Sequence, residues 1–101
     1  MDEVIYSEKL PDSRDITLRL RGRGDIQMYA EDSGETVKEV WGGSDYEFWV
    51  DVPASQLKKV VFALLKERYA GNARAVDEFT EFCKQHNIEH QWASYSSTDF
   101  D

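Results

Sequence analysis

A chain of 101 residues has the length of a single domain. Its 20 Asp and Glu residues against 12 Lys and Arg give a net charge of −8, which argues against a nucleic-acid partner and an anionic membrane surface. One cysteine excludes an internal disulfide and a multi-cysteine zinc site. No apolar run approaches the roughly 20 residues of a membrane span, and the acidic start is unlike a signal peptide, so we expect a cytoplasmic protein.

Alternation of apolar and polar residues predicts antiparallel strands in the first half of the chain. Residues 16–21 alternate strictly, Val4 and Tyr6 indicate an earlier strand, and residues 26–30 continue the pattern. The two glycines within residues 22–25 favour a hairpin between the second and third strands.

A fourth predicted strand carries aromatic side chains on both faces and ends at Pro53, which cannot donate to a sheet ladder. Tyr46 and Phe48 share one face because side chains alternate along a strand. Trp49 then lies on the other face, beside Glu47.

The apolar period changes to 3.6 after this strand and predicts two helices, residues 57–69 and about 73–85. Gly71-Asn72 is a stop signal for the first helix, and Asn87 ends the second. Leu64 and Val76 fall on the apolar stripes, so we expect them to face inward. Residues 88–95 are predicted as a last strand and residues 96–101 as an acidic tail.

The order ββββ-αα-β favours the α+β class. We expect an antiparallel sheet of about five strands with two helices packed on one face. Residues 1–95 would form this single α+β domain, followed by the tail at 96–101.

Catalytic and metal-binding interpretations are weak. Cys83 lies three residues before His86, a spacing that could place a thiol beside an imidazole on one helix. However, Cys83 also falls on the apolar stripe, where a free cysteine usually packs as a small hydrophobe. His86 and His90 could be two metal ligands, but no third is assured. We therefore expect no enzymatic activity, metal or cofactor.

The middle of the chain combines acidic and aromatic residues and is the strongest candidate for a binding site. An exposed tryptophan ringed by carboxylates has the composition of a protein-binding hot spot that attracts a basic partner. Alternatively, Trp49 covers the open face of the sheet together with the aliphatic stems of Arg19 and Arg21, and the acids are merely solvated. The candidate partner-binding residues are Glu39, Trp41, Asp45, Glu47, Trp49 and Asp51.

Short motifs in the chain resemble a family of small acidic, largely uncharacterised bacterial proteins. They are Glu39-Val40-Trp41-Gly42, Asp45-Tyr46-Glu47, Val52-Pro53-Ala54 and Gln85-His86-Asn87-Ile88 with Trp92 beyond it. The resemblance spans residues 14–95 and implies no catalytic motif. In size, charge and α+β make-up the chain is also similar to immunity proteins that neutralise bacterial toxins.

These features favour a small acidic binding protein, an immunity protein that occludes the active site of a basic toxin. Carboxylates would pair with the toxin's Lys and Arg, and the tryptophans would anchor the contact. Two alternatives remain open. One is a phage-encoded inhibitor that mimics nucleic acid, with its acids in a double row. The other is a structural domain that forms a homodimer through its open sheet face.

Overall fold

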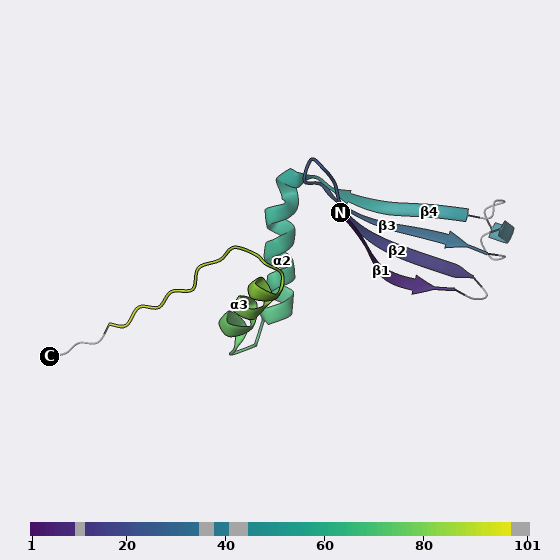
Figure 1. The fold of residues 1–101 in the computed structure, drawn as a ribbon. Coiled ribbons are helices and arrows are strands. Elements are labelled where there is room, and N and C mark those ends of the chain that lie inside the picture. The colour runs from purple at the N-terminus through teal and green to yellow at the C-terminus, as the bar shows by residue number, and fades with distance from the viewer. Residues whose placement is uncertain (10–11, 35–37, 41–44, 98–101) are drawn as a thin grey trace. The chain divides into compact units, whose positions relative to one another are not determined.

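The structure, a computed structural model, describes residues 1–9, 12–34, 38–40 and 45–97. Within these residues the chain forms an antiparallel sheet followed by helices (Figure 1), which confirms the predicted α+β class. The chain divides into two compact units, residues 1–62 and 63–101, and each is described by itself. The packing of the helices on the sheet and the single domain at 1–95 therefore stay predictions.

The sheet consists of strands that follow one another in space as they do in sequence. β1 (Asp2–Glu8), β2 (Ser13–Leu20), β3 (Ile26–Ser33) and β4 (Asp45–Val52) lie in the order β1-β2-β3-β4, and every neighbouring pair is antiparallel. β1 and β4 are thus the two edges of the sheet.

The predicted hairpin between β2 and β3 is confirmed. The N–H of Arg21 donates to the carbonyl of Asp25 at 2.9 Å, and Gly24 adopts a φ of +87° that favours glycine. The carboxylate of Asp25 also accepts a 3.0 Å hydrogen bond from the N–H of Ala54, the first residue of the short 3-10 helix η1 (Ala54–Gln56). The turn therefore satisfies a donor at the start of the helical segment.

Strand pairing gives the sheet two chemically different faces, because residues opposite each other share a face. The apolar face has mainly aliphatic and aromatic side chains at its centre. It comprises Tyr6 of β1, Ile16, Leu18 and Leu20 of β2, Ile26, Met28 and Ala30 of β3, and Tyr46, Phe48, Val50 and Val52 of β4. The same face also carries Glu3, Glu8, Arg14 and Asp32. The polar face comprises Asp2, Val4 and Ser7 of β1, Ser13, Asp15, Thr17 and Arg19 of β2, Gln27, Tyr29, Glu31 and Ser33 of β3, and Asp45, Glu47, Trp49 and Asp51 of β4.

A bulge in β1 divides the two residues that first indicated this strand. Val4 pairs with Thr17 and Tyr6 pairs with Ile16, so the register shifts between them. As a result Val4 belongs to the polar face and Tyr6 to the apolar face. Simple alternation misses this because the bulge adds one residue to one strand only.

Both predicted helices are present and end at the predicted stop signals. α2 (Leu57–Tyr69) is followed by Gly71 at a φ of +76°. α3 (Ala75–Gln85) is followed by Asn87 at a φ of +55°, and the N–H of Ile88 donates to the carbonyl of Cys83 at 2.9 Å. This backbone bond closes the last turn of α3 as left-handed helix ends commonly do.

The unit at 63–101 has a small interior between the end of α2 and α3. The rings of Tyr69 and Phe79 lie 6.0 Å apart, and Cys83 is buried as predicted, with 4% of its surface exposed. Leu64 and Val76 were predicted to face inward, but 59% and 68% of their surfaces are exposed. The two side chains are therefore not part of the interior of this unit, because a two-helix unit buries only a narrow strip of each helix, and their packing on the sheet stays a prediction.

The predicted fifth strand at 88–95 is absent. Residues 88–97 belong to no helix or strand, and the sheet of the described residues has four strands. A strand needs a neighbour for its backbone N–H and C=O groups. The other described elements of this unit are helical and offer no such neighbour. Of the predicted acidic tail, residues 98–101 lie outside the described residues.

The burial of Cys83 predicts that its thiol reacts slowly with reagents from solution. In the native protein we expect a thiol reagent to label Cys83 at least about 100-fold more slowly than in urea, because labelling requires local opening. The measurement is the absorbance of the released thiol product over time. Equal rates with and without urea would contradict the packing role of Cys83.

Candidate functional site

The candidate site lies on the polar face of the sheet. Asp45, Glu47, Trp49 and Asp51 alternate along β4 and share this face, as the sequence predicted. Glu39 is exposed in residues 38–40, which are helical and belong to none of the strands. Trp41 lies outside the described residues. The structure thus brings together four of the six predicted residues.

Trp49 is at one end of a stack of side chains that crosses β2, β3 and β4, with Tyr29 in the middle. Tyr29 of β3 is directly opposite, and the two ring centroids are 6.1 Å apart with an interplanar angle of 24°. The guanidinium carbon of Arg19 lies 4.1 Å from the centroid of the Tyr29 ring. Offset stacking and cation–π contacts both favour this arrangement. Trp49 nevertheless keeps 51% of its surface exposed.

Hydrogen bonds fix the side chains around this stack. The Tyr29 hydroxyl donates to Glu47, and this bond raises the pKa of Tyr29 to about 12. Gln27, which is buried, donates to Asp51 at 2.9 Å and accepts from Arg19 at 3.1 Å. A partner would therefore meet side chains that are already held in place, so binding would cost little side-chain entropy.

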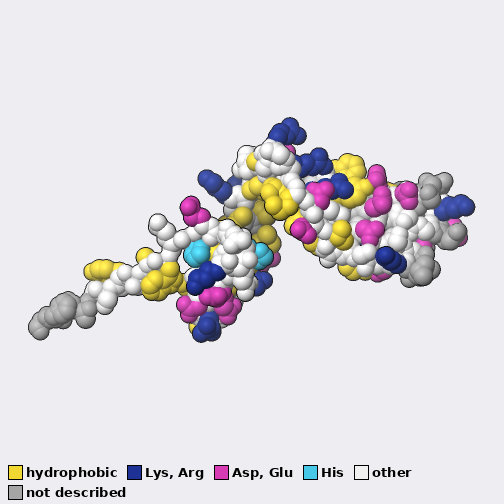
Figure 2. Space-filling view, viewed as in Figure 1, with side chains coloured by type: hydrophobic (Ala, Val, Ile, Leu, Met, Phe, Trp, Pro, Cys, Tyr) yellow, Lys and Arg dark blue, Asp and Glu magenta, His cyan; other side chains and the backbone are white. Residues whose placement is uncertain are grey.

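The polar face carries a strong excess of negative charge. Among its described residues Arg19 is the one cation, 3.8 Å from the carboxylate of Asp2. Figure 2 shows acidic side chains over the sheet beside hydrophobic ones. Partial desolvation raises the pKa of Glu31, and the neighbouring carboxylates raise it further. The acidic residues of the polar face are Asp2, Asp15, Glu31, Asp45, Glu47 and Asp51.

The raised pKa of Glu31 predicts a pH-dependent stability. The folded state holds this proton more tightly than the unfolded chain does, so the stability contributed by Glu31 is present at low pH and is lost as pH rises through its folded pKa. We expect Glu31→Gln to raise the melting temperature at pH 7 and to differ less from the wild type near pH 4. Thermal unfolding at both pH values measures this.

The matched control is Glu89→Gln, which changes the same charge in the exposed segment 88–97 of the other unit. It should leave the melting temperature unchanged at both pH values. If Glu31→Gln is less stable than the wild type at pH 7, favourable contacts of the charged Glu31 outweigh its repulsion by neighbouring carboxylates, and the prediction is wrong.

The exposure of Trp49 lies between the values expected from the two interpretations, an exposed hot spot and a covering of the sheet. Arg19 does cover part of the sheet face, but its guanidinium packs on Tyr29, and Trp49 remains half exposed. Sequence reasoning missed Tyr29 and Gln27 as parts of the site. The signal was their alternation within β3, which places them on the same face as Arg19 once the hairpin register is known.

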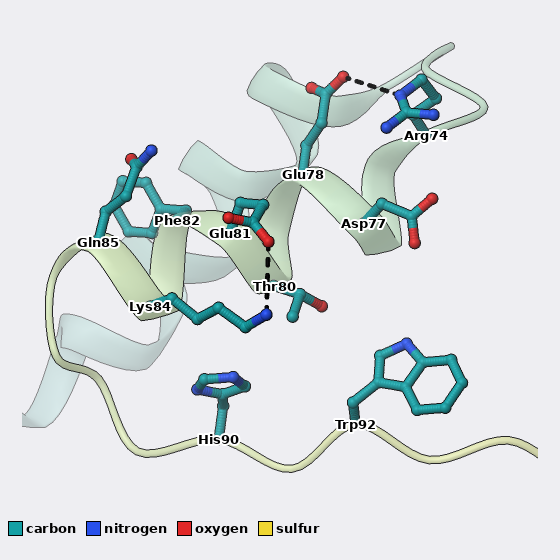
Figure 3. A pocket seen from close by; sticks show the side chains of 10 residues that line it. All are labelled: Arg74, Asp77, Glu78, Thr80, Glu81, Phe82, Lys84, Gln85, His90 and Trp92. Carbon is teal, nitrogen blue, oxygen red and sulfur yellow. Dashed lines mark hydrogen bonds and ion pairs between the residues drawn. The ribbon is translucent and has the colours of Figure 1, made fainter.

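A second concave surface lies in the unit at 63–101, along α3. Figure 3 shows His90 and Trp92 projecting from the extended segment toward the helix. The charged side chains there form the ion pairs Lys84–Glu81 at 3.4 Å and Arg74–Glu78 at 4.0 Å. The groove has a volume of about 750 Å³ and is lined by Arg74, Asp77, Glu78, Thr80, Glu81, Phe82, Lys84, Gln85, His90 and Trp92.

The two histidines have local partners. The His86 ring packs on Phe82 at 4.4 Å between centroids, and His90 Nδ1 lies 2.8 Å from the carbonyl oxygen of Ile88. Across residues 1–9, 12–34, 38–40 and 45–97, no group of three or more His, Cys, Asp or Glu residues is arranged to hold a metal ion. In the same part of the chain, no helix combines the length and apolar character needed to cross a membrane.

Comparison with known proteins yields no relative: the chain matches no protein-family model, no curated protein and no solved structure. The resemblance to small acidic bacterial proteins and to immunity proteins therefore stays a prediction. The fold class follows from the structure, and the polar face of the sheet is the basis for a proposed function.

Proposed function

We propose that this protein is a stoichiometric inhibitor of a basic protein, and specifically an immunity protein that occludes the active site of a bacterial toxin. The observation that supports it is the half-exposed Trp49, stacked on Tyr29 within a face of six carboxylates and one guanidinium. Tryptophan at the centre of a polar ring is typical of binding hot spots.

The charge of the polar face determines which partner it suits. Asp45, Glu47 and Asp51 flank Trp49 on one strand, and Glu31 lies opposite Glu47. A toxin that acts on nucleic acid carries Lys and Arg in its active site, and these would pair with such carboxylates. Together with the net charge of −8, this arrangement would accelerate association at low salt.

The arrangement of the acids favours this proposal over nucleic-acid mimicry. A mimic of duplex DNA would present two parallel rows of charge without an aromatic centre. Here Glu47 and Asp51 flank Trp49 along β4, and Glu31 is next to Tyr29 on this face of β3. Arg19 packs on the Tyr29 ring. An aromatic anchor of this kind suits a protein surface with an apolar pocket.

The test is a genetic and biochemical search among the neighbours of the gene. Each adjoining gene is expressed alone in a bacterial host, and then together with this protein. We expect one product to arrest growth, this protein to restore growth, and the two purified proteins to form a 1:1 complex by titration calorimetry. If no neighbouring product is toxic, or if growth is not restored, the immunity function is refuted.

A further inference from the structure

The edge strand β4 offers a second kind of contact to a partner. β4 pairs with β3 over eight residues without a register shift, and no other described strand pairs with it. Every second residue of an edge strand leaves its backbone N–H and C=O free to pair with an added strand. Within the described strands, the outer side of residues 47–52 of β4 is therefore a template for one more strand.

The opposite edge is less suitable for such pairing. In β1 the register shifts between Val4 and Tyr6, so its backbone groups are not evenly spaced. Bulges of this type commonly protect edge strands from added chains. The structure therefore distinguishes one regular edge from one irregular edge.

We infer that a basic, amphipathic strand of the protein partner adds to β4 and extends the sheet. This inference rests on the proposed function and names how the partner's chain would bind. On the polar face, lysine or arginine residues of the added strand would lie opposite Asp45, Glu47 and Asp51. The Cβ atoms of residues opposite each other in neighbouring strands are about 5 Å apart. On the other side, apolar side chains would continue the face of Phe48 and Val50.

Charge complementarity selects this occupant over others. The β4 carboxylates oppose the addition of a second copy of β4, because like charges would lie opposite each other. The segment 88–95 of this chain contains Glu89 and His90 and no Lys or Arg, so it offers no fixed positive charge to this edge. Phe48 and Val50 are 40% and 65% exposed and add apolar area for the alternate residues of a partner strand.

The test uses an eight-residue peptide of alternating lysine and valine, equal in length to β4. Two further peptides carry backbone N-methyl groups, one on every lysine and the other on every valine. All three have the same side chains and charge, but each methylated peptide loses N–H groups on one edge only. Binding is measured at low salt by amide chemical shifts of the labelled protein.

We expect the unmethylated peptide to shift and protect amides of β4, and one methylated peptide to bind nearly as well. The other should bind at least about tenfold more weakly, because its methyl groups block the edge that faces β4. A peptide with glutamate in place of lysine should not bind. Two methylated peptides that bind alike, or perturbed amides in β1 instead of β4, would refute strand addition.

Two further results separate this inference from the function itself. If β4 amides are already protected from exchange in the free protein, another segment occupies the edge and the inference is wrong. If strand addition fails while a neighbouring toxin is still bound and neutralised, the proposed function holds without it. Failure of the toxin experiment alone would leave a peptide-binding edge and refute the immunity function.

Discussion

Replacing Trp49 by alanine should weaken binding of the proposed toxin partner by about 2 kcal/mol or more, which is about thirtyfold in Kd. Trp49 exposes 51% of its surface in the free protein, and a partner would bury this area against the Tyr29 stack. Loss of a desolvated anchor mainly raises the dissociation rate. Surface plasmon resonance with the toxin immobilised measures both rates.

The controls separate binding from folding. Trp92→Ala removes the same side chain from a 61% exposed position in the other unit, and its binding should match the wild type. Trp49→Phe keeps a ring against Tyr29 and should recover part of the affinity. If Trp49→Ala unfolds the protein, Trp49 is needed for packing of the sheet. If the folded variant binds as tightly as the wild type, the binding site lies elsewhere.

Neutralising the acids of β4 should change mainly the association rate, whereas Trp49→Ala changes mainly the dissociation rate. Asp45→Asn with Glu47→Gln preserves side-chain shape and the acceptor for Tyr29, but removes two charges from the polar face. We expect slower association and a weaker dependence on salt, with little change in dissociation, because peripheral charges act by steering. Association rates at low and high salt measure this. A salt dependence equal to that of the wild type would contradict the steering role.

Gly34→Ala should destabilise the sheet by about 2–3 kcal/mol, the largest effect on stability that we expect from one added methyl group. Gly34 has a φ of +129°, which L-residues rarely adopt. A Cβ at this position would lie 3.0 Å from the Cα of Asp12 and against its side chain. Urea unfolding followed by circular dichroism gives the free energy.

The surroundings of Gly34 leave the backbone little room to move away from an added methyl group. Ser13 and Ser33 are paired residues of β2 and β3 and their hydroxyls are 2.6 Å apart, so both chains are held together beside Gly34. The matched control is Gly22→Ala, since a Cβ there meets nothing within 4 Å. Gly22→Ala should change stability by less than about 0.5 kcal/mol. Equal effects of the two substitutions would contradict the close packing at Gly34.

The sequence was sufficient where structure is governed by neighbouring residues. Alternation predicted the strands and the opposite faces of Phe48 and Trp49, and the local signals Gly71 and Asn87 predicted the helix ends. These features depend on backbone preferences and on the period of side chains, which are properties of a short stretch of chain. The same information predicted that Trp49 and the β4 acids share a face.

Only the tertiary structure decided which side chains meet across strands. The stack of Arg19, Tyr29 and Trp49 requires the registers of β2, β3 and β4 together, and the bulge in β1 changes a register by one residue. The fifth strand was predicted from its alternation, yet residues 88–97 pair with no strand in the described structure. Alternation with a period of two shows that a segment can form a strand. The neighbouring strand that would accept and donate its backbone hydrogen bonds is determined by contacts far away in the sequence.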